Sequence, residues 1–324
     1  EAFSLAPAAR VLGRILGSEV RLVREPTGAE ALAAAQSLAD GQVMMLETLR
    51  FDPREKKSDP SFAAELAQLA DVYVNDAFGA VHRSDASLTA LAGLLPSYAG
   101  LLLEREVAIL SQMLEAPPRP FVAILGGSKV SDKIKIIETM LDTVDSLLIG
   151  GAMSFTFLAA QGLSTGSSLR EDDWVSCAAA TLKKAAEKGV KLLLPLDLVV
   201  ASAPDASAET QVCLADELPD GLMGLDVGPA TCELYGREIA RARTVFWNGP
   251  MGVFELKPFE NGTRQVAQAV ASNKLANTVV GGGDSVAAIK KFGLEDEVSF
   301  ISTGGGATMQ LLEGSPLPGV EALR

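Results

Sequence analysis

The chain has 324 residues, of which 48% are hydrophobic and 5% aromatic, and its formal net charge is −13. A chain of this length is expected to form two domains, and an aliphatic-rich, aromatic-poor composition is typical of α/β proteins. The acidic charge and the absence of any Lys/Arg-rich run argue against a nucleic-acid partner.

The cysteines indicate the compartment. Cys177, Cys213 and Cys232 are odd in number and widely spaced, which fits neither a disulfide framework nor a zinc site. No signal peptide is visible, and the most apolar stretch, residues 88–103, is interrupted by Pro96 and is too short for a membrane span. We therefore expect a cytoplasmic protein without a membrane anchor.

Short apolar runs alternate along the chain with longer helical patterns, which predicts parallel sheets flanked by helices. Asp59 and Pro60 are the expected N-cap and first residue of a helix that continues to residue 69. Another helix should end on the cations of residues 183–188, followed by Gly189. The expected strands are residues 43–46, 72–74, 121–125, 146–149, 191–194, 244–247, 278–280 and 299–301.

Three prolines within residues 116–120 cannot continue the helix expected over residues 104–114. We therefore place the domain boundary there. The predicted organisation is a first domain over residues 1–103, a hinge helix and linker over 104–120, and a second domain over 121–313.

Four glycine-rich turns each follow an apolar run, and three of them lead into a helical pattern. Glycine lets the backbone approach a ligand closely, and a helix N-terminus presents unpaired N–H groups to an anion. Because two lysines and an aspartate lie in these turns, they predict a nucleotide-phosphate site. The four segments are GGSKVSDK (126–133), VFWNGPMGVFE (245–255), GGGDS (281–285) and STGGGA (302–307).

Lys129 and Lys133 are four positions apart, which predicts that they share one helix face and repel each other unless an anion lies between them. A solvated face is the alternative, but the preceding glycines favour the anion. No Walker A loop is present. Asp284, after three glycines, is either a helix N-cap or a ligand of Mg²⁺ beside phosphates.

The glycines at 304–306 either allow tight packing or form an N–H cradle for a phosphoryl group. Arg50 and Arg83 follow apolar strands by a few residues, where open α/β sheets bind ligands, and guanidinium groups suit carboxylate and phosphate. His82, the single histidine, is more often structural in such a position.

These segments, together with LETLRF (46–51) and VNDAFGAVHR (74–83), resemble bacterial phosphoglycerate kinase in the same order, as far as LPGV at 317–320. The resemblance implies two doubly wound, Rossmann-like parallel-sheet domains joined by a helical hinge, with residues 314–324 returning to the first domain. It also implies reversible phosphoryl transfer between 1,3-bisphosphoglycerate with ADP and 3-phosphoglycerate with ATP, in glycolysis and gluconeogenesis. The expected partners are these small molecules alone, and the expected state is a monomer.

The resemblance also assigns residues. Lys129, Gly304 and Gly305 would stabilise the phosphoryl group in flight, Glu255 would hold the ribose hydroxyls, and Asp284 would contact Mg²⁺ of the Mg–ATP or Mg–ADP complex. Arg50, Arg83 and His82 would bind the triose phosphate, although the family commonly has a histidine at the position of Asp85. The full nucleotide-binding set is Gly126, Gly127, Lys129, Lys133, Gly151, Gly224, Asn248, Glu255, Gly282, Gly283, Asp284 and Ser285.

The chain opens on a helical pattern without an initiator Met or an opening strand. The resemblance implies several dozen earlier residues that carry an Asp-x-Asn strand, an arginine and a His-x-Gly-Arg loop of the triose site. We therefore expect this chain to bind Mg–ADP, to bind 3-phosphoglycerate poorly and to turn over little, and its first domain to be unstable. Two alternatives are a nucleotide-binding remnant without catalysis and, more weakly, an NAD-dependent dehydrogenase, for which no G-x-G-x-x-G motif follows the first strand.

Overall fold

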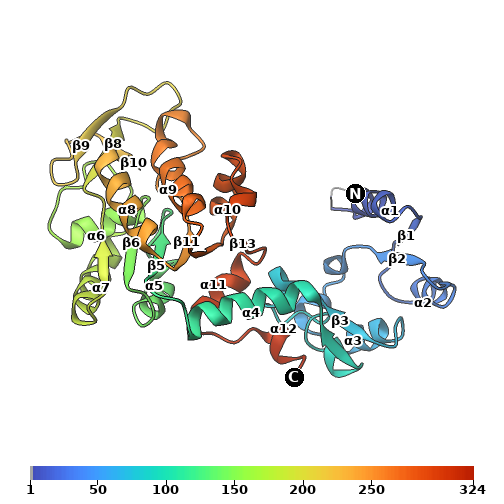
Figure 1. Ribbon diagram of the computed structural model, residues 1–324. Helices are drawn as coiled ribbons and strands as arrows, with labels where there is room; N and C mark the ends of the chain where they lie inside the picture. Colours follow the sequence, from blue (N-terminus) through green and yellow to red (C-terminus); the bar gives the residue numbers. More distant parts are fainter. Residues whose placement is uncertain (1–2) are drawn as a thin grey trace. The chain divides into compact units, whose positions relative to one another are not determined.

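The computed structural model describes residues 3–324, which divide into two compact units (Figure 1). The first unit runs to Val107 and includes Pro316–Arg324, and the second is Ala108–Ser315. The division lies inside α4 (Leu101–Glu115), earlier than the boundary expected at the prolines of residues 116–120. Apolar side chains are buried in both halves of α4, for example Leu103 and Leu110, so each half contributes to a different unit.

The first unit contains two small parallel pairs of strands. Strand β1 pairs with β2, and β3 pairs with β4. Strands β2 and β3 were expected, but β1 and β4, their respective partners, were not, because each is short and partly exposed. The elements are α1 (Ala6–Leu16), β1 (Val20–Val23), α2 (Ala29–Gln36), β2 (Val43–Leu46), α3 (Pro60–Ala67), β3 (Tyr73–Asn75), β4 (Ser97–Ala99) and α12 (Pro318–Glu321).

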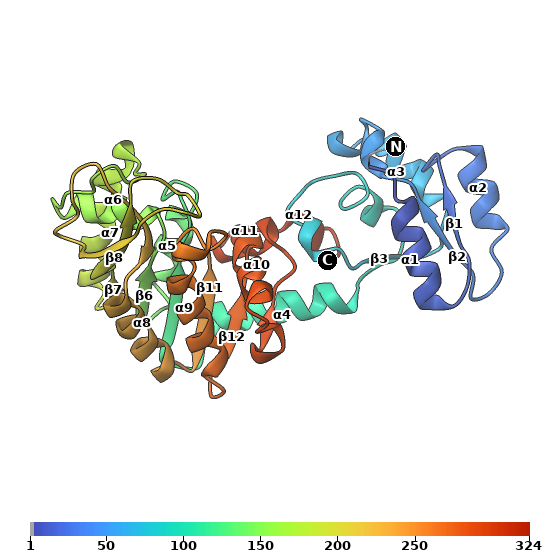
Figure 2. The same ribbon diagram turned by 90° about the horizontal axis from the view of Figure 1, so that it is seen from above.

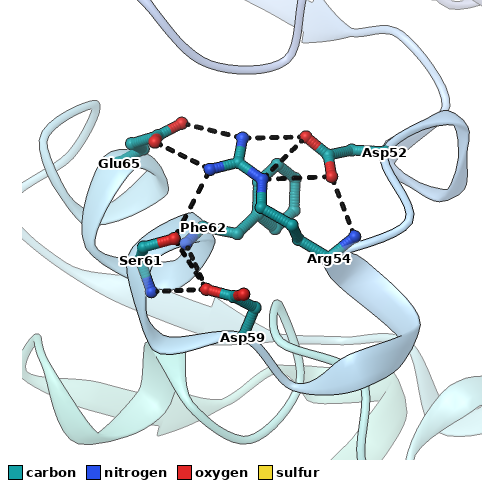
Figure 3. A network of polar contacts seen from close by, with 6 residues as sticks. All are labelled: Asp52, Arg54, Asp59, Ser61, Phe62 and Glu65. Carbon is teal, nitrogen blue, oxygen red and sulfur yellow. Dashed lines mark hydrogen bonds and ion pairs between the residues drawn. The ribbon is translucent and has the colours of Figure 1, made fainter.

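Helix α3 begins as its sequence predicts. The Asp59 carboxylate accepts hydrogen bonds from the backbone N–H groups of Ser61 at 2.8 Å and Phe62 at 3.4 Å (Figure 3). Pro60 occupies the first helical position, where a backbone N–H is not needed. The helix ends at Ala67, slightly before the predicted residue 69.

Arg54 connects the turn before α3 to the helix itself. Its guanidinium group lies between the carboxylates of Asp52 and Glu65, each at 2.8 Å, and over the ring of Phe62 at 5.0 Å (Figure 3). The paired guanidinium group lowers the pKa of the Asp52 and Glu65 carboxyl groups. This network fixes the entry of the chain into the helix whose Phe62 is fully buried.

The second unit is built on a six-stranded parallel sheet in the order β13-β12-β11-β5-β6-β7. The chain starts at β5 in the middle, moves outward through β6 to β7, returns to β11 on the other side, and moves outward to β13. This is the doubly wound order expected, with the reversal between β5 and β11. The strands are β5 (Phe121–Leu125), β6 (Ser146–Ile149), β7 (Lys191–Leu193), β11 (Thr244–Asn248), β12 (Asn277–Val280) and β13 (Phe300–Ile301).

Helices cover this sheet. Buried side chains of β5 and β11, such as Ile124 and Trp247, form one core with Tyr235 of α8, Val266 of α9 and Ile289 of α10. Figure 2 shows α8 and α9 alongside the parallel strands. The helices of this unit, besides the part of α4 that belongs to it, are α5 (Ile134–Met140), α6 (Met153–Ala160), α7 (Val175–Glu187), α8 (Pro229–Arg241), α9 (Asn261–Ser272), α10 (Gly283–Lys291) and α11 (Gly306–Leu312).

A three-stranded antiparallel sheet, in the order β10-β8-β9, adds to the second unit and was not predicted from the sequence. It consists of β8 (Asp197–Ala201), β9 (Gln211–Leu214) and β10 (Met223–Val227). Its buried Leu198 and Val200 pack with Phe155 and Leu158 of α6. Within residues 3–324, no helix is long and apolar enough to cross a lipid bilayer.

Candidate active site

The glycine-rich turns meet at one edge of the parallel sheet. Each directly follows a strand, and the carboxyl ends of parallel strands lie at the same edge, so the turns after β5, β6, β11, β12 and β13 are neighbours. Backbone hydrogen bonds join them: the N–H of Gly126 donates to Asn248 O at 2.9 Å, and the N–H of Gly151 donates to Met251 O at 3.0 Å. The site therefore lies where the strand order reverses.

A largely apolar cavity of about 360 Å³ opens beside these turns. It brings together Gly127, Gly151, Gly224, Glu255 and Asp284 from the predicted set. Its apolar wall comes from α6, from strands β8 and β10 of the antiparallel sheet, and from the turn after β11. The wall includes Phe155, Leu198, Met223, Leu225, Val227, Met251 and Val253.

A second, polar cavity of about 270 Å³ adjoins the first and shares Gly127, Ser128 and Asp284 with it. An apolar space beside a space lined by two lysines suits a ligand with an uncharged ring at one end and an anion at the other. The predicted residues that line this polar cavity are Gly127, Lys129, Lys133, Asn248, Gly282, Gly283, Asp284, Ser285 and Gly305.

Two predicted residues support the site without lining either cavity. A Cβ at Gly126 would lie 2.1 Å from Pro250 O, so the absence of a side chain allows two turns to touch. Gly304 is buried, and its N–H donates to Ser302 Oγ at 3.2 Å. That amide is therefore already used within the protein, whereas Gly305 faces the polar cavity.

The prediction that Lys129 and Lys133 share a helix face is wrong. Helix α5 begins only at Ile134, so both lysines lie in the preceding turn. The turn is held by Glu171, which accepts hydrogen bonds from Ser131 N at 3.0 Å and Ser131 Oγ at 2.6 Å. As a result, Lys129 is exposed at the cavity, while Lys133 points inward.

Lys133 lies in surroundings that disfavour its charged form. Its Nζ donates to Asn248 O at 3.3 Å and also to Asn248 Oδ1. Burial lowers the pKa of Lys133 to about 8, although the carboxylates of Asp284 and Asp132 oppose this shift. An anion in the polar cavity would restore the charged form of this lysine.

Asp284 does not cap its helix. The N-cap of α10 is Gly282, and the Asp284 side chain makes no capping hydrogen bond. Its side chain is exposed and borders both cavities. Among residues 3–324, no group of three or more His, Cys, Asp or Glu side chains could hold a metal ion. A single carboxylate suits Mg²⁺ only when phosphate and water oxygens supply the other ligands.

Two glycines of the site are required by backbone geometry. Gly151 has φ +67°, and a Cβ there would lie 2.5 Å from both the N and the O of Gly127. Gly282 has φ +90°, and a Cβ there would lie 2.5 Å from Asn248 Nδ2, which donates to Gly281 O at 2.8 Å. Any side chain at these positions would force apart the turns that form the polar cavity.

Sequence reasoning missed the role of Asp226. This carboxylate is 3% exposed, lines the apolar cavity, and accepts hydrogen bonds from Gly262 N at 2.6 Å and Val227 N at 2.9 Å. Burial raises the pKa of Asp226 to about 8, despite the two N–H donors that lower it. The available signal was a lone acidic residue inside the apolar run of β10.

The residues assigned to the triose phosphate lie in the first unit. Arg50 is already paired with Asp85, with Nη2 at 2.5 Å from the carboxylate, and Arg83 Nε donates to His82 Nε2 at 3.3 Å. Burial, followed by the charge of Arg83, lowers the pKa of His82. Because Asp85 pairs with Arg50, it neutralises part of the positive charge expected among the triose-phosphate residues.

Comparison with known proteins identifies the relatives of the chain. The family described as "Phosphoglycerate kinase" matches residues 1–315. Two curated proteins of that name are similar to the chain over 100% of its length and 82% of their own, with 55% identity in Herpetosiphon aurantiacus and 53% in Moorella thermoacetica.

Solved structures show the same similarity. Phosphoglycerate kinase from Coxiella burnetii has a TM-score of 0.90 and 43% identity, covering 100% of the chain and 81% of that protein. The enzyme from Pyrococcus horikoshii OT3 has a TM-score of 0.86 and 31% identity, covering 99% and 82%.

Proposed function

The chain belongs to the phosphoglycerate kinase family, and we propose that it transfers a phosphoryl group reversibly between 1,3-bisphosphoglycerate with ADP and 3-phosphoglycerate with ATP. The observation that carries this proposal is the pair of adjoining cavities at the carboxyl edge of the doubly wound sheet, one apolar and one lined by Lys129, Lys133 and Asp284. The proposal includes a monomer that acts on small molecules in the cytoplasm, as part of glycolysis and gluconeogenesis.

The nucleoside would occupy the apolar cavity. Gly151 and Gly224 line this cavity, and Phe155, whose ring lies against Gly224, supplies an aromatic wall. Glu255 lies exposed at the same cavity, where a carboxylate can accept hydrogen bonds from ribose hydroxyls. The polar cavity next to it would then hold the phosphates.

The phosphates would meet Lys133, Ser285 and the backbone of Gly282 and Gly283. Asp284 would hold Mg²⁺ together with the phosphates, and the ion would neutralise phosphate charge when bound. This fit rests on the position of Asp284, which is exposed and borders both cavities, while Asp132 also lines the polar cavity.

Lys129 would stabilise the transferring phosphoryl group. Its exposed side chain borders the polar cavity together with Gly305. Phosphoryl transfer needs little covalent chemistry from a protein, so positioning and charge stabilisation can supply most of the catalysis. Gly305 suits this role better than Gly304, whose N–H already donates to Ser302.

In the first unit, Arg83, Arg50 and His82 would bind the triose phosphate. Arg83 offers a guanidinium group for phosphate or carboxylate, while Arg50 shares its charge with Asp85. We expect Arg83 to contribute more to binding than Arg50, because the Arg50–Asp85 pair must be loosened before Arg50 can bind a substrate anion.

A coupled steady-state assay with 3-phosphoglycerate, ATP and Mg²⁺ tests the proposal. ADP should form only when all three are present, and reactions that omit 3-phosphoglycerate are the control for simple ATP hydrolysis. Calorimetric titration of the same protein with Mg–ADP shows whether the nucleotide site is intact. Binding of Mg–ADP without any turnover would overturn the kinase proposal and leave a nucleotide-binding protein without catalysis.

A further inference from the structure

Glu255 lies in a turn, outside any regular helix or strand. Its position at the apolar cavity therefore depends on the contacts that hold residues 249–255. Two of these are made early in the segment: Met251 N donates to Thr263 Oγ1 at 3.0 Å, and Val253 N donates to Leu225 O at 2.8 Å. Neither contact reaches the peptide bond that leads into Glu255.

The side chain of Lys291 contacts this peptide bond. Its Nζ donates to Phe254 O at 2.6 Å and lies 5.9 Å from the centre of the Phe254 ring. The Phe254 carbonyl belongs to the peptide unit whose nitrogen is that of Glu255. Because a peptide unit is planar, holding this carbonyl fixes the direction in which the chain enters Glu255.

Lys291 is itself held in place. Glu260, whose side chain is 11% exposed, lies 2.8 Å from Lys291 Nζ and 2.5 Å from Arg264 Nη2. Hydrogen bonding by Lys291, and then by Arg264, lowers the pKa of the Glu260 carboxyl group. A lysine already held by a mostly buried carboxylate loses less side-chain freedom when it binds a carbonyl than a free surface lysine does.

Lys291 also ends α10, the helix whose second residue is Asp284. One rigid helix thus reaches the polar cavity with its first turn and the Glu255 segment with its last residue. This arrangement sets the separation between the two subsites that a nucleotide must span.

We propose that Lys291 is a positioning residue that sets the preference of the site for nucleotides with intact ribose hydroxyls, by holding the Phe254 carbonyl and thereby the Glu255 carboxylate. The inference rests on the proposed ribose role of Glu255. Lys291 itself touches no substrate atom in this account. Its effect should therefore appear only with ligands that offer hydroxyl groups to Glu255.

The test compares Mg–ADP with Mg–2′,3′-dideoxy-ADP, which lacks both ribose hydroxyls, by calorimetry. Lys291→Met should lower the affinity for ADP about fivefold or more and leave that for the dideoxy nucleotide unchanged. Lys290→Met is the matched control, because Lys290 is the exposed neighbour on the same helix, and it should leave both affinities unchanged. Lys291→Arg should retain part of the preference for ADP over the dideoxy nucleotide that Lys291→Met loses.

Two further variants separate the possible failures. Glu255→Gln should lower the same preference, and Lys291→Met should have no further effect in that background. If Glu255→Gln leaves the preference intact, the ribose role fails and the inference fails with it. If Glu255→Gln lowers the preference while Lys291→Met does not, only the inference is overturned.

An equal loss of affinity for both nucleotides in Lys291→Met would show a general structural role and would also overturn the inference. Glu260→Gln removes the carboxylate that holds Lys291 and keeps the proposal testable if Lys291→Met does not fold. It should reduce the ADP preference in the same direction, and an unchanged preference in a folded Glu260→Gln protein counts against the proposal.

Discussion

Binding of Mg–ADP should take up a proton at alkaline pH through Lys133. Burial lowers the pKa of this lysine to about 8 in the protein without nucleotide. On that value, about 0.1 of the molecules carry a neutral lysine at pH 7, about 0.5 at pH 8 and about 0.9 at pH 9. Phosphate oxygens beside Nζ favour the charged form, so the bound lysine stays protonated over this range.

The difference between the pKa of Lys133 in the free protein and in the complex sets the direction in which affinity changes with pH. Nucleotide binds the protonated form, so its affinity is complete below the pKa of the free protein and is lost as the pH rises above it. Proton uptake should be about 0.5 at pH 8 and about 0.9 at pH 9, and the affinity should fall about tenfold between pH 7 and pH 9. Nucleotide phosphates are already ionised at pH 8, since their last pKa is about 6.

Calorimetry in two buffers with different ionisation enthalpies measures the uptake at each pH. Lys133→Met should bind Mg–ADP more weakly, with no uptake and no change in affinity across the range. Lys135→Met, which replaces an exposed lysine of α5, should behave like the unmodified protein. The reasoning is refuted if the unmodified protein takes up no proton at pH 8–9, or if Lys133→Met takes up as much.

Three other predictions follow from single residues. Lys129→Ala should lower kcat by roughly 10²–10³ with little change in Mg–ADP affinity, because its partner is charge that develops in the transition state. Steady-state kinetics beside calorimetry, with Lys135→Ala as the control, tests this, and near-normal turnover removes Lys129 from catalysis. Asp284→Asn should weaken Mg–ADP binding more than binding of metal-free ADP, and equal losses with and without Mg²⁺ would contradict the metal role. Asp59→Ala removes the cap of α3 and should lower the denaturation midpoint of the first unit without altering ADP affinity; an unchanged midpoint would contradict the capping role.

The central strands β5, β6 and β11 of the large sheet could be predicted because they are buried on both faces. Such strands form continuous apolar runs, as in Phe121–Leu125, where all five residues are buried. The antiparallel sheet could not be predicted in this way. Strand β9 is mostly exposed although three of its four residues, Val212, Cys213 and Leu214, are apolar, so this short run does not mark a buried strand. Its pairing with β8 depends on contacts across an intervening loop.

The site shows the same division. The sequence alone predicted which turns lie together, because glycine turns after apolar strands must gather at one edge of a parallel sheet. The tertiary structure decided how they are presented. Glu171, 40 positions from Ser131, keeps Lys129 and Lys133 out of a helix. Gly262, 36 positions from Asp226, donates the hydrogen bond that holds a buried carboxylate at the cavity wall. Such contacts join distant parts of the chain, and no local pattern of residues encodes them.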